Sequence, residues 1–192
     1  QAALVVRHQT GAHRVDLLTW GLVPGWMKEP GKIRPINARA ETIHQKPMFR
    51  DAFRHQRCLV LCDGYYEWKK LANGRKQPYH LGRTDGSPFV MAGLWSDNAH
   101  AASEGIQTFC VITTPASGEV ATIHHRMPVI LPRAAQTQWL DPLVSKTEQV
   151  QELLLNGDVD LSVYPVSTFV NSPANNSAKC AIRLAESVTG AN

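Results

Sequence analysis

The 192-residue chain has 43% hydrophobic and 19% charged residues and a formal net charge of +4. This is the composition of an ordinary globular protein with enough residues for a proper core. No apolar run reaches the length of a membrane span, and the N-terminus lacks the apolar region of a signal peptide. We therefore expect no membrane partner and a cytoplasmic, nucleoid-associated protein, and the sequence gives no reason to expect an oligomer rather than a monomer.

Charge is distributed unevenly along the chain. Residues 1–96 contain 15 Lys and Arg against 7 Asp and Glu, a balance of +8, whereas residues 97–192 contain 5 against 9, a balance of −4. A basic half on an otherwise unremarkable domain favours a polyanionic partner, with nucleic acid the first candidate. The alternative is a solvated surface that is merely rich in lysine.

Strand-like segments dominate the sequence. They are rich in β-branched and aromatic residues and are separated by turn residues. The predicted strands are 3–7, 14–23, 57–68, 77–83, 87–95 and 106–114. The segments 73–78 and 83–88 are predicted hairpin connections, and the Asn-Gly pair in the first suits positive φ.

Helical patterns are fewer, at 46–56, 132–140 and 145–155. In the first, Pro47 suits an opening helical turn; in the last, Ser145 and Glu148 have the spacing of a capping box. Scattered helices among many short strands predict an α+β fold with an antiparallel, barrel-like β core and a few peripheral helices. No linker or repeat interrupts the chain, so we expect a single domain over 1–192.

The four cysteines, Cys58, Cys62, Cys110 and Cys180, form no CxxC pair and no zinc-ribbon spacing. Three of them lie in apolar, strand-like runs, where a cysteine usually serves as a small buried hydrophobe. No glycine-rich nucleotide-binding loop is visible either. We expect neither a metal nor a cofactor.

The segment 20–42, "WGLVPGWMKEPGKIRPINARAET", is the first candidate for function. It combines tryptophans with Arg and Lys on a loop rich in Pro and Gly. Such a loop suits single-stranded nucleic acid, because bases stack on rings while cations hold phosphates. A Trp-anchored loop packed on the sheet is the plainer alternative.

Glu67 and the His124–His125 pair are the second and third candidates. Glu67 stands among aromatic residues in "CDGYYEWKK", where burial can raise the pKa of a carboxyl into the working range of a general acid. Alternatively, Tyr66 and Trp68 point inward and Glu67 faces solvent. Either histidine of "IHHRMPVIL" can shuttle protons near neutral pH. Adjacent histidines on a strand point to opposite faces, which disfavours a metal site.

Four motifs, "WGLVPGW", "INARAET", "CDGYYEWKK" and "IHHRMPVIL", in this order and with these gaps, resemble the SRAP (SOS response-associated peptidase) family. The segment 164–172, "YPVSTFVNS", resembles the family's C-terminal motif. The resemblance implies recognition of abasic sites in single-stranded DNA during DNA repair. It also implies a protective crosslink, in which an N-terminal cysteine forms a Schiff base through its amine and then a thiazolidine through its thiol. A self-cleaving peptidase activity at the N-terminus is implied as well.

The resemblance also assigns roles to particular residues. The implied catalytic residues are Asn37, Glu67 and His124, of which Asn37 positions the N-terminal residue and the sugar. The implied DNA-binding residues are Trp26 and Met27, which contact bases beside the lesion, and Arg39 and Arg126 of the DNA-binding cleft.

The sequence departs from the family pattern in three places. The family's opening "MCGR" and the segment that follows it are absent, so we expect a chain truncated at its N-terminus that lacks the nucleophile. Neither Cys58 nor Cys62 replaces that nucleophile, because neither carries a free α-amine. His125 stands where the family has aspartate, and Cys62 stands where it often has alanine.

Two rival functions remain open. One is a cysteine-type peptidase that pairs His124 with Cys110 or Cys62, which requires hydrogen-bond reach between them. The other is a non-covalent clamp for single-stranded DNA, held by the basic half and Trp26, with salt-sensitive affinity and no covalent product.

Overall fold

The computed structural model describes residues 1–28, 31, 34–101, 105–155 and 160–185. The chain forms two compact units and passes between them several times. The first comprises Gln1–Cys62, Phe89–Pro115 and Arg126–Val159, and the second comprises Asp63–Pro88, Ala116–His125 and Asp160–Asn192. The single-domain organisation stays a prediction. Among the described residues, no helix is long and apolar enough to cross a membrane.

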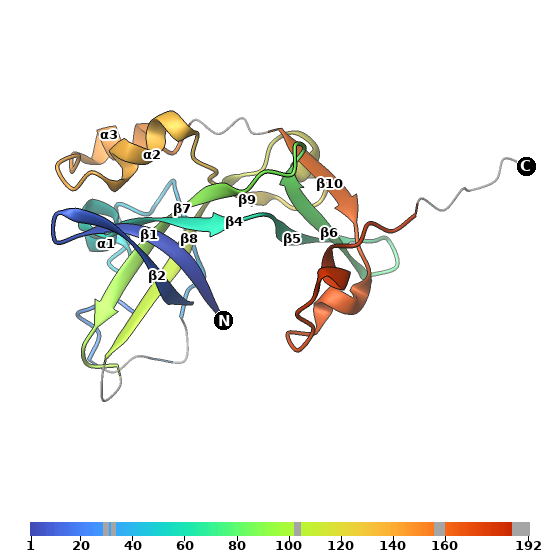
Figure 1. Ribbon diagram of the computed structural model, residues 1–192, viewed down its shortest axis with the longest axis horizontal. Coiled ribbons are helices and arrows are strands. Elements are labelled where there is room, and N and C mark those ends of the chain that lie inside the picture. The colour runs from blue at the N-terminus through green and yellow to red at the C-terminus, as the bar shows by residue number, and fades with distance from the viewer. Residues whose placement is uncertain (29–30, 32–33, 102–104, 156–159, 186–192) are drawn as a thin grey trace, which may run out of the picture. The chain divides into compact units, whose positions relative to one another are not determined.

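A seven-stranded sheet forms the centre of the first unit (Figure 1). Its strands are β1 (Ala2–Gln9), β2 (Ala12–Trp20), β3 (Asn37–Arg39), β4 (Arg57–Cys62), β7 (Phe89–Asn98), β8 (Ile106–Pro115) and β9 (Arg126–Pro128). The order is β2-β1-β4-β7-β8-β3, β9 pairs with β8, and β2 also pairs with β8, which closes five strands into a ring. The barrel-like α+β prediction is therefore confirmed. Two pairings, β2–β8 and β3–β8, are parallel, which an antiparallel prediction did not include.

Three helices cover one face of this sheet: α1 (Arg50–His55), α2 (Arg133–Leu140) and α3 (Thr147–Glu152). Each contributes a fully buried side chain, Phe53, Trp139 and Val150, to a single core. Sheet residues of the same core include Leu59 and Ile112. Burying an aromatic or aliphatic side chain stabilises a fold by roughly 1.5–3 kcal/mol, so this core stabilises the sheet that carries Asn37 and Arg39 on β3.

All three predicted helices exist, but their beginnings differ from the prediction. α1 begins at Arg50, so Pro47 lies in the preceding turns rather than in the first helical turn. α3 has Lys146 as its N-cap, without a side-chain capping bond. The predicted capping box of Ser145 and Glu148 is therefore wrong, because the helix begins one residue too late for Ser145 to cap it.

Arg57, at the start of β4, ties the helices to the sheet. It is buried, and its guanidinium donates to five backbone carbonyls, those of Phe53, Arg54, Trp139, Asp141 and Val144. Burial lowers the pKa of Arg57 to about 10, and Asp141 opposes the shift. The carbonyl groups at the ends of α1 and α2, which have no partner within the helix, are thereby satisfied.

The second unit is built on a three-stranded sheet in the order β10-β6-β5, with β10 (Leu161–Pro165), β6 (Lys76–Arg83) and β5 (Tyr65–Lys70) (Figure 1). Three 3-10 helices accompany it: η1 (Gly118–Thr122), η2 (Thr168–Asn171) and η3 (Ala178–Ala181). The predicted strand 57–68 is in fact two strands, β4 and β5, separated by Asp63 and Gly64. Gly64 is required there because a Cβ would collide with the ring of His80.

The side chains of this small sheet alternate between its faces. Tyr66, His80 and Tyr164 lie in register across the three strands, with ring centroids 5.4 and 5.1 Å apart. Successive residues of a strand point to opposite faces. Glu67 therefore faces away from this aromatic row, and its cross-strand neighbour is Tyr79.

A five-residue connection joins β5 to β6 at the predicted hairpin. Gly74 has φ +78°, and the N–H of Arg75 donates to the side chain of Asn73. Leu71 and Arg75 close the loop through a backbone hydrogen bond of 2.8 Å. The Asn-Gly signal is thus confirmed, with Gly74 alone taking the positive φ.

Candidate active site and nucleic-acid interface

Glu67 lies in the middle of β5 and is largely buried, with a side chain 22% exposed. Burial raises the pKa of the Glu67 carboxyl, while the charge of His124 and the backbone hydrogen bond of Trp68 oppose the rise. The prediction of a solvent-facing glutamate is therefore wrong. Strand alternation places Tyr65 and Tyr79, rather than Tyr66 and Trp68, on the same face as the carboxyl.

His124 stands just after η1, whose last turn is closed by the N–H of His124 donating to the carbonyl of Val120 at 3.0 Å. Its Nδ1 lies 3.7 Å from Oε2 of Glu67. This is ion-pair distance for a protonated imidazole and too long for a direct hydrogen bond. Thus Glu67 and His124, separated by 57 positions in the sequence, meet within the second unit.

The histidine pair differs from its predicted arrangement. Neither His124 nor His125 belongs to a strand, since β9 begins at Arg126. Their rings lie 4.4 Å apart at 46°, side by side rather than on opposite faces. Within the described part of the chain, no three His, Cys, Asp or Glu side chains are grouped so that they could hold a metal ion.

A buried carboxyl beside an imidazole can perform general acid–base chemistry. The carboxyl with a raised pKa retains a proton at higher pH than an ordinary glutamate, and the imidazole beside it can accept or return that proton. His124 remains 35% exposed, so the pair is accessible to a substrate. The pair is thus suited to proton transfer at a carbonyl or hydroxyl group.

Asn37 and Arg39 lie on β3, the short parallel neighbour of β8. Both are exposed, whereas Ala38 between them is buried against the helix-covered core. Strand alternation therefore directs the amide of Asn37 and the guanidinium of Arg39 to the same face. An amide and a cation on one exposed face provide hydrogen-bond donors for an anionic ligand.

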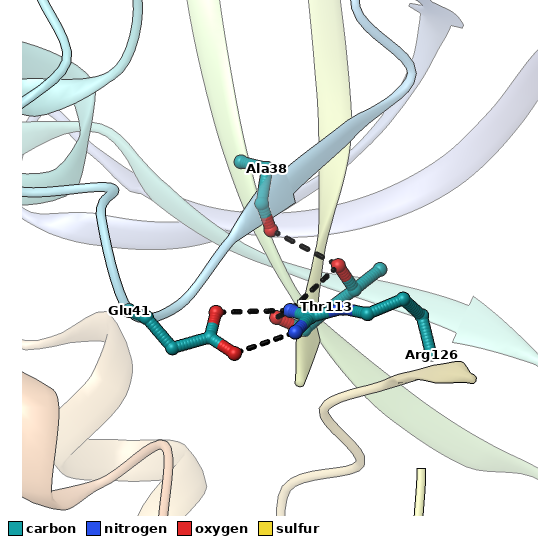
Figure 2. A network of polar contacts seen from close by, with 4 residues as sticks. All are labelled: Ala38, Glu41, Thr113 and Arg126. Carbon is teal, nitrogen blue, oxygen red and sulfur yellow. Dashed lines mark hydrogen bonds and ion pairs between the residues drawn. The ribbon is translucent and has the colours of Figure 1, made fainter. Parts of the chain in front are cut away.

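Arg126 is held in a network that Figure 2 shows. Its Nη1 donates to Oε1 of Glu41 at 2.5 Å, and its Nη2 donates to Oε2 of Glu41 at 3.0 Å and to the carbonyl of Thr113 at 2.5 Å. The hydroxyl of Thr113 donates in turn to the carbonyl of Ala38 at 3.5 Å. The Arg126 side chain is only 15% exposed and that of Glu41 46%. One edge of this guanidinium is therefore occupied by protein acceptors.

Glu41 lies in the field of two arginines. Its pKa is lowered, first by the hydrogen bond from Arg126 and in smaller part by the charge of Arg39. The three charges Arg39, Glu41 and Arg126 leave a net +1 on this part of the first unit. Arg39 is exposed and, within the described part of the chain, no carboxylate holds it in such a bidentate pair, so it is available to a phosphate.

Trp26 and Met27 lie on a loop that is fixed to the sheet. Buried Asn98 donates to the carbonyls of Pro24 and Met27 at 2.6 and 2.9 Å. Gly25 is pressed against β7, since a Cβ there would lie 2.8 Å from the carbonyl oxygen of Asp97. The loop is therefore packed on the sheet, as the plainer alternative has it, but Trp26 itself is 56% exposed and available to a ligand. Of the same segment, residues 29–30 and 32–33 lie outside the described part.

The sequence did not reveal three residues that hold the candidate site residues in place: Asn98, Glu41 and Thr113. Asn98 ends a strand-like run and carries no local signal for holding a loop 71 positions away. Glu41 lies within the "INARAET" motif, but its partner Arg126 is 85 positions away, so no local pattern connects the two. Thr113 looked like an ordinary strand residue.

The sequence places Cys58, Cys62 and Cys110 in apolar, strand-like runs, and burial is confirmed for Cys58 and Cys110 but not for Cys62, which is half-buried. Cys58, Cys110 and Cys180 are buried, and burial raises the pKa of Cys110 to about 12. The pKa of Cys58 is raised as well, again by burial. Thiolate formation at these two residues is strongly disfavoured at neutral pH.

The fold and the motif residues define a protein of the SRAP class. Residues 1–173 match the family described as SOS response associated peptidase (SRAP), and the chain belongs to this family. It is 38% identical over 182 residues to the abasic site processing protein YoaM of Bacillus subtilis, which covers 93% of this chain and 80% of the relative.

Another relative and a solved structure show the same similarity. The chain is 33% identical over 168 residues to the abasic site processing protein YedK of Escherichia coli, covering 86% of this chain and 73% of the relative. A crystal structure of a protein from Bacteroides thetaiotaomicron superimposes with a TM-score of 0.83 at 28% identity, covering 96% of this chain and 82% of that one.

Proposed function

We propose that this chain recognises abasic sites in single-stranded DNA and takes part in their protection or repair. The names of its relatives support the substrate. The observation that carries the proposal is the approach of Glu67 to His124 at 3.7 Å, in the two motifs that the family shares. A largely buried carboxyl with a raised pKa beside an imidazole is typical of catalytic sites, which favours chemistry over binding alone.

The proposed chemistry acts on the aldehyde of the opened abasic sugar. An amine nitrogen attacks the aldehyde carbon, a proton passes to the oxygen, and the hydroxyl leaves as water to give a Schiff base. A thiol then adds to the carbon–nitrogen double bond and closes a thiazolidine. Glu67 supplies the proton to the departing hydroxyl, and His124 relays protons to and from the sugar oxygen during ring opening.

The nucleophile of that reaction is an N-terminal cysteine in the family resemblance, and it is none of Cys58, Cys62, Cys110 and Cys180. Asn37 is the proposed positioning residue for this nucleophile and the sugar. A peptidase activity at the N-terminus would use the same residues, since cleavage of an amide also needs a positioned proton donor.

DNA is held by stacking and by charge in this proposal. Trp26 offers an exposed ring on a fixed loop, on which a base beside the lesion can stack, and Met27 contacts the same base. Arg39 binds a phosphate directly. Arg126 is held by Glu41, so in this proposal it supports DNA binding through its charge at a fixed position. It is not free to donate a bidentate pair of hydrogen bonds to a phosphate.

Two rival functions are less well supported. A peptidase that uses Cys110 is disfavoured by the complete burial of this thiol and its pKa of about 12. A non-covalent DNA clamp is consistent with Trp26 and Arg39 but leaves the burial of Glu67 unexplained.

The deciding experiment incubates the complete gene product with a single-stranded oligonucleotide carrying one abasic site and analyses the mixture on a denaturing gel. A slow-migrating covalent band with the abasic oligonucleotide, absent with the undamaged one, supports the proposal. Salt-sensitive binding to both oligonucleotides without any covalent band would instead indicate the clamp.

A further inference from the structure

The tip of the β5–β6 hairpin is strongly basic and fully solvated. Residues 70–76 are all exposed, and they include the cations Lys70, Arg75 and Lys76, with half-buried Lys69 just before them. No Asp or Glu occurs between Glu67 and Asp85 in the sequence. Leu71, 37% exposed, is the main apolar group of the tip.

The strand register places two of these cations directly opposite one another. Lys70 pairs with Lys76 in the antiparallel ladder. Directly opposed side chains have Cβ atoms about 4.5–5.5 Å apart, and like charges in such a pair destabilise the sheet. In the described part of the chain, no carboxylate forms an ion pair with Lys69, Lys70, Arg75 or Lys76.

We propose that this basic tip, residues 69–76, binds the phosphate backbone of the DNA that flanks the lesion. An unfavourable cation pair at the end of a hairpin is relieved when a polyanion binds. The tip lacks an exposed aromatic ring or a sizeable apolar patch, so it suits phosphates better than bases or an apolar protein surface.

The position of the tip relative to Glu67 determines which phosphates it meets. β5 carries Glu67 and continues to Lys70, so the two Cα atoms are about 10 Å apart along the extended strand. Lys69 shares the face of Glu67, because it lies two positions along, whereas Lys70 and its partner Lys76 lie on the opposite face of the hairpin. The inference rests on the proposed function in this respect: DNA bound at Glu67 and His124 would extend past the tip on one side.

The test uses the full chain and variants that separate charge from folding. Lys70→Gln/Lys76→Gln removes the pair, Lys76→Glu converts it to an attractive one, and Lys146→Glu makes the same charge change at an exposed lysine of the first unit. Affinity is measured for undamaged and abasic single-stranded oligonucleotides at several salt concentrations between 50 and 200 mM.

We expect the double variant to bind both oligonucleotides more weakly and to reduce the slope of log affinity against log salt by about 1.4, which is two contacts at 0.7 each. Lys76→Glu should weaken binding while raising Tm by roughly 1–4 °C, because an opposite-charge pair replaces a like-charge one. Opposite signs for affinity and stability exclude misfolding as the cause. Lys146→Glu should leave the slope nearly unchanged.

Unchanged affinity and slope in the hairpin variants would overturn the inference, and so would an equal loss in Lys146→Glu, which would indicate net charge alone. These results are distinguishable from failure of the proposed function. That failure is seen in the wild-type protein, as an inability to distinguish abasic from undamaged DNA, whereas the hairpin is judged by the salt slope on either one.

Discussion

Glu41 holds Arg126 by two hydrogen bonds, with Nη1 donating to Oε1 at 2.5 Å and Nη2 donating to Oε2 at 3.0 Å. The pair ties the start of β9 to the segment that follows β3. Charge-assisted, bidentate pairs of this kind are stronger than neutral hydrogen bonds and fix the plane of the guanidinium. Arg126 is thus positioned by the fold itself, and DNA need not order it.

Glu41→Gln should therefore destabilise the protein at pH 7 by about 1 kcal/mol, a value reduced for the exposure of Glu41. The pKa of Glu41 is lowered in the fold, so its contribution is present above the unfolded value and is lost as pH falls through the lowered pKa. Urea unfolding of both proteins from pH 7 down to acid pH measures this. A difference that persists undiminished in acid would contradict the pairing.

The contribution of Glu67 to stability should depend on pH in the opposite direction to that of Glu41. Burial raises its pKa, so between the unfolded value and the raised one the folded state binds more protons than the unfolded chain. The stability that Glu67 contributes is then lost as pH rises through this window, and Glu67→Gln should have a higher Tm than wild type at pH 7. The advantage should vanish at acid pH, where Glu67 is protonated. A lower Tm of the variant at pH 7 would show that the carboxylate is stabilising.

Trp26 and Asn98 should act as a unit in binding DNA. Trp26→Ala should weaken binding of single-stranded DNA by roughly 1–3 kcal/mol, the contribution of one stacked base. Asn98→Ala should weaken it too, because the loop loses its two hydrogen bonds to the sheet. The double variant should lose less than the sum of the two.

The control for this cycle is Leu143→Ala, which removes another exposed apolar side chain, 88% exposed. It should leave affinity unchanged. Strict additivity of Trp26→Ala and Asn98→Ala, measured by fluorescence anisotropy, would contradict the role of Asn98 as the anchor of the loop.

Arg57→Met should destabilise the protein by about 3 kcal/mol or more. The variant preserves much of the apolar stem but leaves five carbonyl acceptors without their donor. Chemical unfolding measures the loss. A variant as stable as wild type would mean that water replaces the guanidinium at little cost.

The sequence predicted the strands well because their β-branched and aromatic runs are long, and each of the six has a counterpart in the structure. It missed β3, which has three residues and exists only through pairing with β8, and β10 (Leu161–Pro165), which pairs with β6. The boundary between β4 and β5 was missed for a similar reason. Glycine stands at this break because a Cβ at position 64 would meet the ring of His80, which lies 16 positions further along.

The residues of the candidate site were named from the sequence, but the arrangement of their side chains in space could not be predicted from it. Periodicity could not reveal that Glu67 faces Tyr79, nor that His124 precedes the strand instead of belonging to it. Asn98, which fixes the Trp26 loop, lies too far along the chain for any local pattern to connect the two. The roles of Asn37, Glu67, His124 and the DNA-binding residues stay predictions until they are measured.

The rate of covalent crosslinking to an abasic single-stranded oligonucleotide tests the central claim most directly, with the complete gene product and its Glu67→Gln variant compared at equal occupancy. The account predicts that the variant crosslinks at least 100-fold more slowly, the scale of a general acid, while its affinity for the oligonucleotide is unchanged. Equal rates for the two proteins, or no covalent product from the wild type, would contradict it.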